Sequence, residues 1–182
     1  MVLDWGNIIY VLIVALPALI IRKIDSSIEL KRIKLDEKKW KAKYFLEEKN
    51  KILRNLHKSI AVLYYSTVSY VLGDVKIKKI GEYNEYKSQY SSFKINKDLA
   101  KIYLNEIENS KISKFFGALS SAQNNIFANL PDDHKFKEYF GKNYIENKEK
   151  IGITDISKLN EMLSSSYDEA LECLIDKLNP KL

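Results

Sequence analysis

The chain of 182 residues has little cysteine and little histidine: one Cys, at position 173, and two His, at positions 57 and 134. A single cysteine excludes an intramolecular disulfide. Two histidines and one cysteine do not make the four-ligand set that a tetrahedral zinc site needs. Cys173 lies between Leu171 and Leu174 in an amphipathic pattern, which predicts a small buried apolar side chain. We therefore expect no metal and no other cofactor.

The few side chains that could act in catalysis lie in patterns that predict structural roles. His57 falls within an apolar periodic pattern at 53–60, so we expect it to be partly buried at the edge of a core face. His134 follows Asp132 and Asp133 at the start of a short helical pattern, where acidic side chains are expected to cap the helix. Three adjacent residues in one helical turn do not converge on a metal ion.

Glycine and proline are also scarce, with six and three residues. The sequence contains no glycine-rich phosphate loop, no Ser-x-x-Lys pair and no nucleophile elbow. A composition with few turn formers and many Lys, Ile, Glu and Asn residues is typical of a helical protein with short connections. We therefore predict a protein that is not an enzyme.

A long apolar run is present at the N-terminus, from Ile8 to Ile21, and Arg22 and Lys23 follow it directly. This pattern predicts a single transmembrane helix over residues 1–23, although the run is short for about 30 Å of hydrocarbon. The alternatives are a buried core helix and a cleaved signal peptide. The signal peptide is disfavoured because the basic residues follow the run and do not precede it.

Basic residues are concentrated just after this run, with thirteen Lys or Arg against six Asp or Glu between Arg22 and Lys58. The positive-inside rule then predicts a cytoplasmic C-terminal domain, an external N-terminus and contact with anionic lipids of the inner leaflet. Nucleic acid is a less favoured partner, because membrane proximity accounts for the charge. The predicted residues of the membrane interface are Trp5, Arg22, Lys23, Lys31 and Arg32.

Residues 24–44 are rich in charge and contain no Gly or Pro, which predicts a solvated helical stalk. A coiled-coil seam can be written through Ile24, Ile28 and Leu35, but Lys31 and Lys38 fall at its core positions. Buried lysines weaken a coiled-coil dimer. Self-association through the stalk alone is therefore not the expected mode.

Residues 45–182 predict a domain of four or five helices, most simply an antiparallel bundle. We expect Gly73 and Asp74 to end the long first helix, Asn96 and Thr154 to cap two later helices, and Pro131 to start a short helix that Gly141 closes. A break near Asn109 and Ser110 is an alternative, and residues 75–80 are either a loop or a short strand. The predicted fold class is all-α.

Aromatic residues recur at helical spacing after Gly81, at Tyr83, Tyr86, Tyr90 and Phe93. Such a stripe belongs either to the core of the bundle or to a partner surface. We predict a single-pass membrane protein that binds a protein partner or self-associates, as an anchor, scaffold or effector. The architecture is analogous to that of small anchored proteins of bacterial phage-defence and stress operons, without a shared motif. The alternative is a tethered sensor whose bundle binds a small ligand or nucleotide.

Overall fold

The computed structural model describes residues 16–73 and 75–179, and it describes side-chain burial from residue 22 onward. These residues form α-helices, one short 3-10 turn and no strand, so the all-α prediction is confirmed for the described part of the chain. The elements are α2 (Leu16–Val71), α3 (Ile80–Ala100), η2 (Lys101–Tyr103), α4 (Glu106–Ala128), α5 (His134–Phe140), α6 (Tyr144–Lys150) and α7 (Ile156–Leu178).

The predicted single-pass topology requires correction. No helix within residues 16–73 and 75–179 is long and apolar enough to cross a membrane. In the described part of α2, the six residues Leu16–Ile21 are followed by Arg22, Lys23 and Asp25, so charge interrupts the apolar run within two turns. Residues 1–15 of the predicted span lie outside the described residues. The finding overturns the predicted localisation. The predicted contact with anionic lipids stays a prediction.

The contacts divide the chain into two compact units, residues 1–48 and residues 49–182. In the first unit, every residue from 22 to 48 is exposed. In the second unit, the part of α2 from residue 49 onward buries Leu53, Leu56, Ile60 and Leu63 completely. Their spacing of three and four residues places them on one face of the helix, as the sequence predicts.

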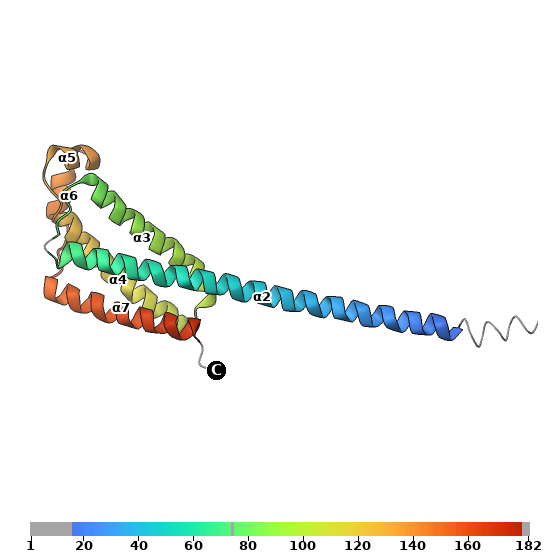
Figure 1. The fold of residues 1–182 in the computed structure, drawn as a ribbon. Coiled ribbons are helices and arrows are strands. Elements are labelled where there is room, and N and C mark those ends of the chain that lie inside the picture. The colour runs from blue at the N-terminus through green and yellow to red at the C-terminus, as the bar shows by residue number, and fades with distance from the viewer. Residues whose placement is uncertain (1–15, 74, 180–182) are drawn as a thin grey trace, which may run out of the picture. The chain divides into compact units, whose positions relative to one another are not determined.

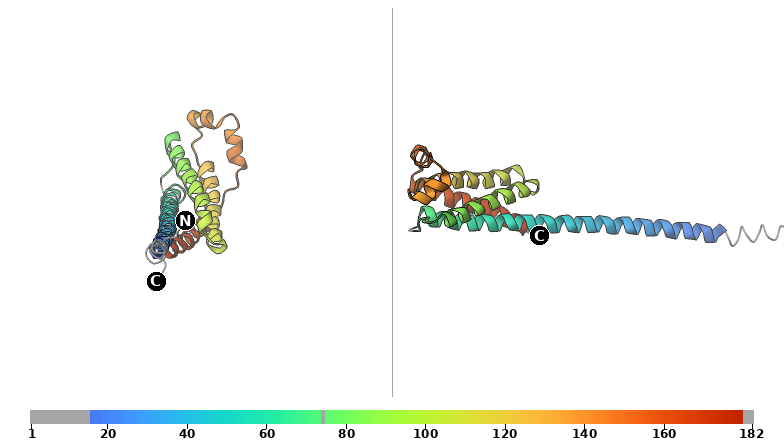
Figure 2. Two further views of the ribbon diagram at one scale, coloured as in Figure 1. Left: turned by 90° about the vertical axis from the view of Figure 1, so that its right-hand side faces the viewer. Right: turned by 90° about the horizontal axis from the view of Figure 1, so that it is seen from above.

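The second unit is a helical bundle whose long helices run antiparallel to their sequence neighbours (Figures 1 and 2). The side-chain contacts give the directions. Lys114 and Lys177 pair with Glu169 and Glu108, so α4 and α7 run in opposite directions. Between α3 and α4, Tyr90 meets Ser120, whereas Lys97 lies over the ring of Phe116 further along α3. One continuous apolar core joins all of these helices.

One polar pair lies inside this core, between α2 and α3. The hydroxyls of Thr67 and Tyr86 are 3.2 Å apart, and the two residues are 0% and 2% exposed. Each hydroxyl satisfies the other, which removes the cost of burying an unpaired polar group.

The segment between α2 and α3 is a loop in its described residues 75–79, so the alternative of a short strand is wrong. The predicted helix end is confirmed, since α2 stops at Val71 and the amides of Leu72 and Gly73 donate to the carbonyl of Val68. A Cβ at position 73 would lie 2.7 Å from the carbonyl oxygen of Ser69. The close approach of the turning chain to its own helix thus requires glycine there.

Two predicted caps are wrong. Asn96 lies inside α3, and α4 is capped by Asn105, whose side chain accepts from the amide of Glu108 while the Glu108 carboxylate accepts from the amide of Asn105. The chain breaks earlier than the alternative at Asn109, because η2 and an extended Leu104 separate α3 from α4. The last helix, α7, is capped by Asp155 and not by the preceding residue.

The residue predicted to cap α7, Thr154, makes a different contact. The side chain of Asn125, on α4, donates to the Thr154 carbonyl at 2.7 Å and accepts from the Thr154 amide at 2.9 Å. Asn125 is only 2% exposed. This pair of hydrogen bonds ties the loop before α7 to the buried side of the last turn of α4.

The short helices α5 and α6 cover one end of the bundle (Figure 1). Asp133 caps α5, and Gly141 ends it with φ of +86°, a conformation that favours glycine. The helix α6 was not predicted. Lys148 anchors α6, donating to the Leu130 carbonyl and to Asp132 at 2.6 Å each.

Candidate binding site between α3, α4 and α6

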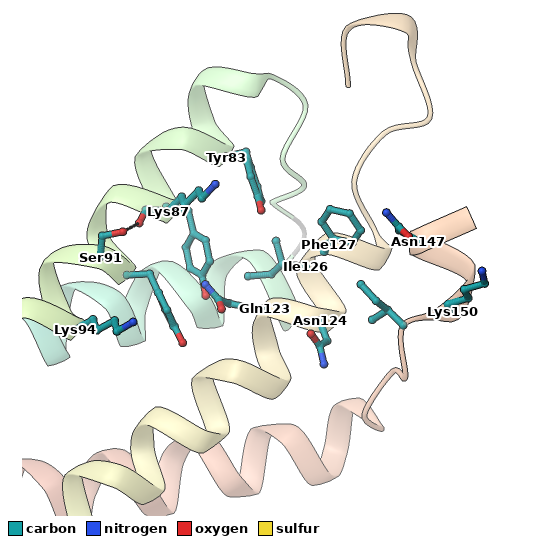
Figure 3. Close-up of a pocket in the computed structure, with 13 residues that line it drawn as sticks. Tyr83, Lys87, Ser91, Lys94, Gln123, Asn124, Ile126, Phe127, Asn147 and Lys150 are labelled. Carbon is teal, nitrogen blue, oxygen red and sulfur yellow. Dashed lines mark hydrogen bonds between the residues drawn. The ribbon is translucent and has the colours of Figure 1, made fainter. Parts of the chain in front are cut away.

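A hollow of about 760 Å³ lies within the bundle unit, between α3, α4 and α6. Figure 3 shows its lining: Tyr83, Lys87, Ser91 and Lys94 come from α3, four residues from Gln123 to Phe127 come from α4, and Asn147 and Lys150 come from α6. Binding sites for small ligands have volumes of roughly 300–1,000 Å³. The hollow is therefore of a size to hold a ligand of moderate size.

The aromatic stripe predicted from the sequence divides between this hollow and the core. Tyr83, Tyr86 and Tyr90 line the hollow. Phe93 is fully buried and packs edge-on against Phe115 at 5.7 Å between ring centroids. The helical spacing places all four on one face of α3. Tyr83 and Tyr90 are partly exposed, Tyr86 is a core residue that also borders the hollow, and Phe93 lies in the core away from it.

Hydrogen bonds hold two of these tyrosines in place. Tyr86 pairs with Thr67, and the Tyr90 hydroxyl lies 3.3 Å from that of Ser120. Burial raises the pKa of Tyr86, an effect that the hydrogen bond from Thr67 only partly offsets. Burial also raises the pKa of Tyr83, with a smaller contribution from Tyr139. The phenols of Tyr83 and Tyr86 are therefore neutral at neutral pH.

Aromatic side chains pack behind the wall of the hollow that Phe127 and Tyr83 form. Phe127 lies edge-on to Phe140 at 5.1 Å and to Tyr144 at 5.7 Å, and Phe140 also meets Tyr83 at 5.2 Å. Edge-to-face pairs of this kind add to the stabilisation from burial. The cluster joins α3, α4, α5 and α6, so it fixes the position of the short helices relative to the tyrosine wall.

The rim of the hollow is positively charged. Lys87, Lys94 and Lys150 line it, and no Asp or Glu is among its lining residues. Lys150 pairs with Glu146 outside the hollow, whereas neither Lys87 nor Lys94 lies in an ion pair with a described residue. Two rim lysines that lie in no ion pair, Lys87 and Lys94, favour an anionic ligand.

Neutral polar groups complete the lining. Gln123 and Asn124 from α4 and Asn147 from α6 offer both amide donors and carbonyl acceptors, and Ser91 offers a hydroxyl that donates to the Lys87 carbonyl. The described lining contains no histidine, cysteine or carboxylate, the groups that most often act as general bases or nucleophiles. The arrangement can bind a ligand through hydrogen bonds and charge.

The remaining predicted site residues lie elsewhere. Trp5 is outside the described residues, and Arg22, Lys23, Lys31 and Arg32 are exposed on α2. Cys173 is buried at 7% exposure, as predicted, and burial raises the pKa of its thiol. Among the described residues, no group of three or more His, Cys, Asp and Glu side chains is placed to hold a metal ion.

The sequence did not predict this hollow. The tyrosine spacing on α3 indicated one wall, but the lining residues from α4 and α6 are 29 to 67 positions away from those of α3 along the chain, and no local pattern marks them. Comparison of the chain with known protein families, with curated proteins and with solved structures finds no match.

Proposed function

We propose that this protein is a non-catalytic binding protein whose helical bundle binds a nucleotide, or another anion that carries a flat ring, in the hollow between α3, α4 and α6. The observation that favours this function is the pairing of aromatic walls with a rim of three lysines and no carboxylate. This choice follows the alternative predicted from the sequence, a small-ligand or nucleotide sensor, without its membrane tether.

Each part of a nucleotide has a matching group in the lining. A base ring can lie against the side chains of Tyr83, Tyr90 and Phe127, since stacking on aromatic rings tolerates any base. Amides such as Gln123 and Asn124 can pair with the donors and acceptors on the edge of a base. Lys87 and Lys94 can neutralise a phosphate, and hydrogen bonds to charged groups are worth about 1.5–3 kcal/mol each.

The proposal is tested by isothermal titration calorimetry of the full chain with AMP, adenosine and inorganic phosphate. We expect AMP to bind more tightly than either fragment, because only AMP fills the aromatic wall and the cationic rim together. Lys87→Gln and Lys94→Gln should each weaken AMP binding by about tenfold, which corresponds to about 1.4 kcal/mol.

A matched control is Lys101→Gln, which removes the same charge from an exposed residue of η2 outside the hollow. It should leave AMP binding unchanged. Equal losses in all three lysine variants would indicate only non-specific attraction to net positive charge. If AMP, ADP and ATP all bind with dissociation constants weaker than about 1 mM, the proposed ligand class is wrong.

A further inference from the structure

The α3 wall of the hollow carries the same two groups twice. Tyr83 is followed four residues later by Lys87, and Tyr90 is followed four residues later by Lys94. All four side chains line the hollow. The second pair repeats the first after seven residues, which is two helical turns and a rise of about 10 Å. We name Tyr83 with Lys87 the first pair and Tyr90 with Lys94 the second pair.

Burial separates these pairs from the core face of α3, which also repeats along the helix. The buried residues of α3 are Tyr86, Phe93 and Ala100. Tyr83 and Tyr90, in contrast, are only partly buried. The lysines of both pairs are exposed. The repeat of a ring and a lysine is therefore a property of the wall of the hollow, in addition to the periodicity of the core face.

Separate contacts hold the two tyrosine rings. Tyr83 lies edge-on to Phe140 at 5.2 Å between ring centroids. Tyr90 lies 5.7 Å from Phe116, and its hydroxyl is 3.3 Å from that of Ser120. Since the two rings have different supporting residues, each can receive a flat base of its own. Stacking of successive bases on successive aromatic side chains is the usual way in which proteins hold unpaired nucleotides.

The rings and the lysines alternate along the helix. Their order is a ring at 83, a lysine at 87, a ring at 90 and a lysine at 94. Figure 3 shows Tyr83, Lys87 and Lys94 following one another along α3. Neither lysine makes an ion pair with a described residue, so both ammonium groups are available to a phosphate.

This alternation distinguishes between two kinds of dinucleotide. Two nucleotides joined by a 3′–5′ phosphodiester present phosphate, base, phosphate and base in turn. Two nucleosides joined 5′ to 5′ through a diphosphate present both phosphates together, between the bases. We infer that the ligand of the hollow is a dinucleotide of the first kind, with one base on each tyrosine and one phosphate at each lysine. The inference rests on the proposed function and specifies which nucleotide the hollow binds.

The spacing of the pairs also sets the conformation of the ligand. Stacked neighbouring bases in one strand are about 3.4 Å apart. The two tyrosines are separated by about 10 Å along the helix, so the two bases must be unstacked. Proteins commonly bind unpaired nucleotides with the bases splayed apart in this way. A volume of about 760 Å³ lies in the upper part of the usual range for ligand sites, which suits a dinucleotide better than a single nucleotide.

Isothermal titration calorimetry of the full chain tests this inference with AMP, linear pApA, cyclic di-AMP and 5′–5′-linked diadenosine diphosphate. We expect two AMP molecules per chain and one pApA. Linear pApA should bind more than tenfold more tightly than AMP, because linking two ligands raises the apparent affinity by about 10²–10⁴. Cyclic di-AMP also alternates base and phosphate, so its affinity relative to pApA shows whether the linear or the closed form is preferred. The 5′–5′-linked compound should bind more weakly than pApA.

Variants of single pairs locate the two halves of the ligand. Lys87→Gln and Lys94→Gln should each weaken pApA binding by about tenfold, and in AMP titrations each loss should fall on only one of the two sites. Tyr83→Leu combined with Lys87→Gln should leave one AMP per chain and bind pApA no more tightly than AMP. Lys101→Gln is again the matched control and should change neither stoichiometry nor affinity. Circular dichroism and the melting temperature check that each variant is folded.

The outcomes separate this inference from the proposed function. One AMP per chain, or a gain of tenfold or less for both pApA and cyclic di-AMP, would overturn the dinucleotide and leave nucleotide binding in place. Tighter binding of the 5′–5′-linked compound than of pApA would overturn the assigned order of bases and phosphates. If all four compounds bind with dissociation constants weaker than about 1 mM, both the inference and the proposed function are wrong.

Discussion

At the scale of single residues, Asn125 is the buried polar side chain with the clearest structural task. It satisfies both backbone groups of Thr154, and no water can replace it readily at 2% exposure. An unpaired buried donor or acceptor costs about 1–3 kcal/mol. The Asn125 side chain therefore stabilises the fold mainly because it satisfies the two backbone groups of Thr154.

We predict that Asn125→Ala lowers the free energy of unfolding by about 2–4 kcal/mol, because both backbone groups of Thr154 lose their partner. Urea unfolding followed by circular dichroism measures the loss. Asn124→Ala is the control, since this neighbour is exposed and should change the stability by less than about 0.5 kcal/mol. A loss of the same small size for both variants would show that the hydrogen bonds to Thr154 contribute little.

At the scale of helices, the ends depend on caps that are specific to position. Asn105 and Glu108 cap α4 reciprocally, whereas Asn96 lies within α3 and makes only a weak contact of 3.5 Å with the carbonyl of Asn55. Both asparagines precede apolar periodic patterns in the sequence. Asn105 becomes the cap because α3 ends at η2, so that α4 begins only after Asn105.

Asn105→Ala should therefore lower the free energy of unfolding by about 1 kcal/mol, as expected for the loss of a helix cap. Asn96→Ala should have almost no effect, because alanine favours a helix interior. Thermal and urea unfolding of the two variants provide the comparison. A larger loss of stability for Asn96→Ala than for Asn105→Ala would contradict this assignment and would indicate that Asn96 acts as the cap.

Helix content and the main core face were predictable because both follow from periodicity within one segment. The face through Leu53, Leu56 and Ile60 and the closure of α5 by Gly141 are examples. The end of α3, the cap at Asp155 and the whole of α6 were not predictable. Each depends on contacts with distant residues, such as the hydrogen bond that Lys148 donates to the Leu130 carbonyl.

The candidate site shows the same limit. The spacing of Tyr83, Tyr86 and Tyr90 identified one wall, but it could not separate the tyrosines of the hollow from Phe93 in the core. The cationic rim was hidden because Lys87, Lys94 and Lys150 are scattered among thirty basic residues. Only the packing of α3, α4 and α6 brings these three lysines to one surface.

At the scale of the whole molecule, the two units differ in what holds their backbone in place. The unit of residues 49–182 has a continuous apolar core, whereas residues 22–48 bury no side chain. Local opening costs least where few apolar contacts must break. Nine of the residues in 22–48 are Lys or Arg, and each is a potential trypsin site.

Limited trypsin digestion of dilute protein should therefore cut first within residues 22–48 and leave a resistant fragment that begins near residue 49. Mass spectrometry of the early fragments measures the order of cleavage. First cleavage within α3, α4 or α7 would contradict the assigned order of local stability.

The hydroxyl pair of Thr67 and Tyr86 has a consequence for the uniqueness of the fold. An interface of purely apolar side chains tolerates a slide of one helix past another by a turn, because one methyl group can replace another. Such a slide between α2 and α3 would leave both hydroxyls buried without a partner, at about 1–3 kcal/mol each. This pair therefore excludes alternative packings of the two helices, and its contribution is to conformational specificity more than to strength.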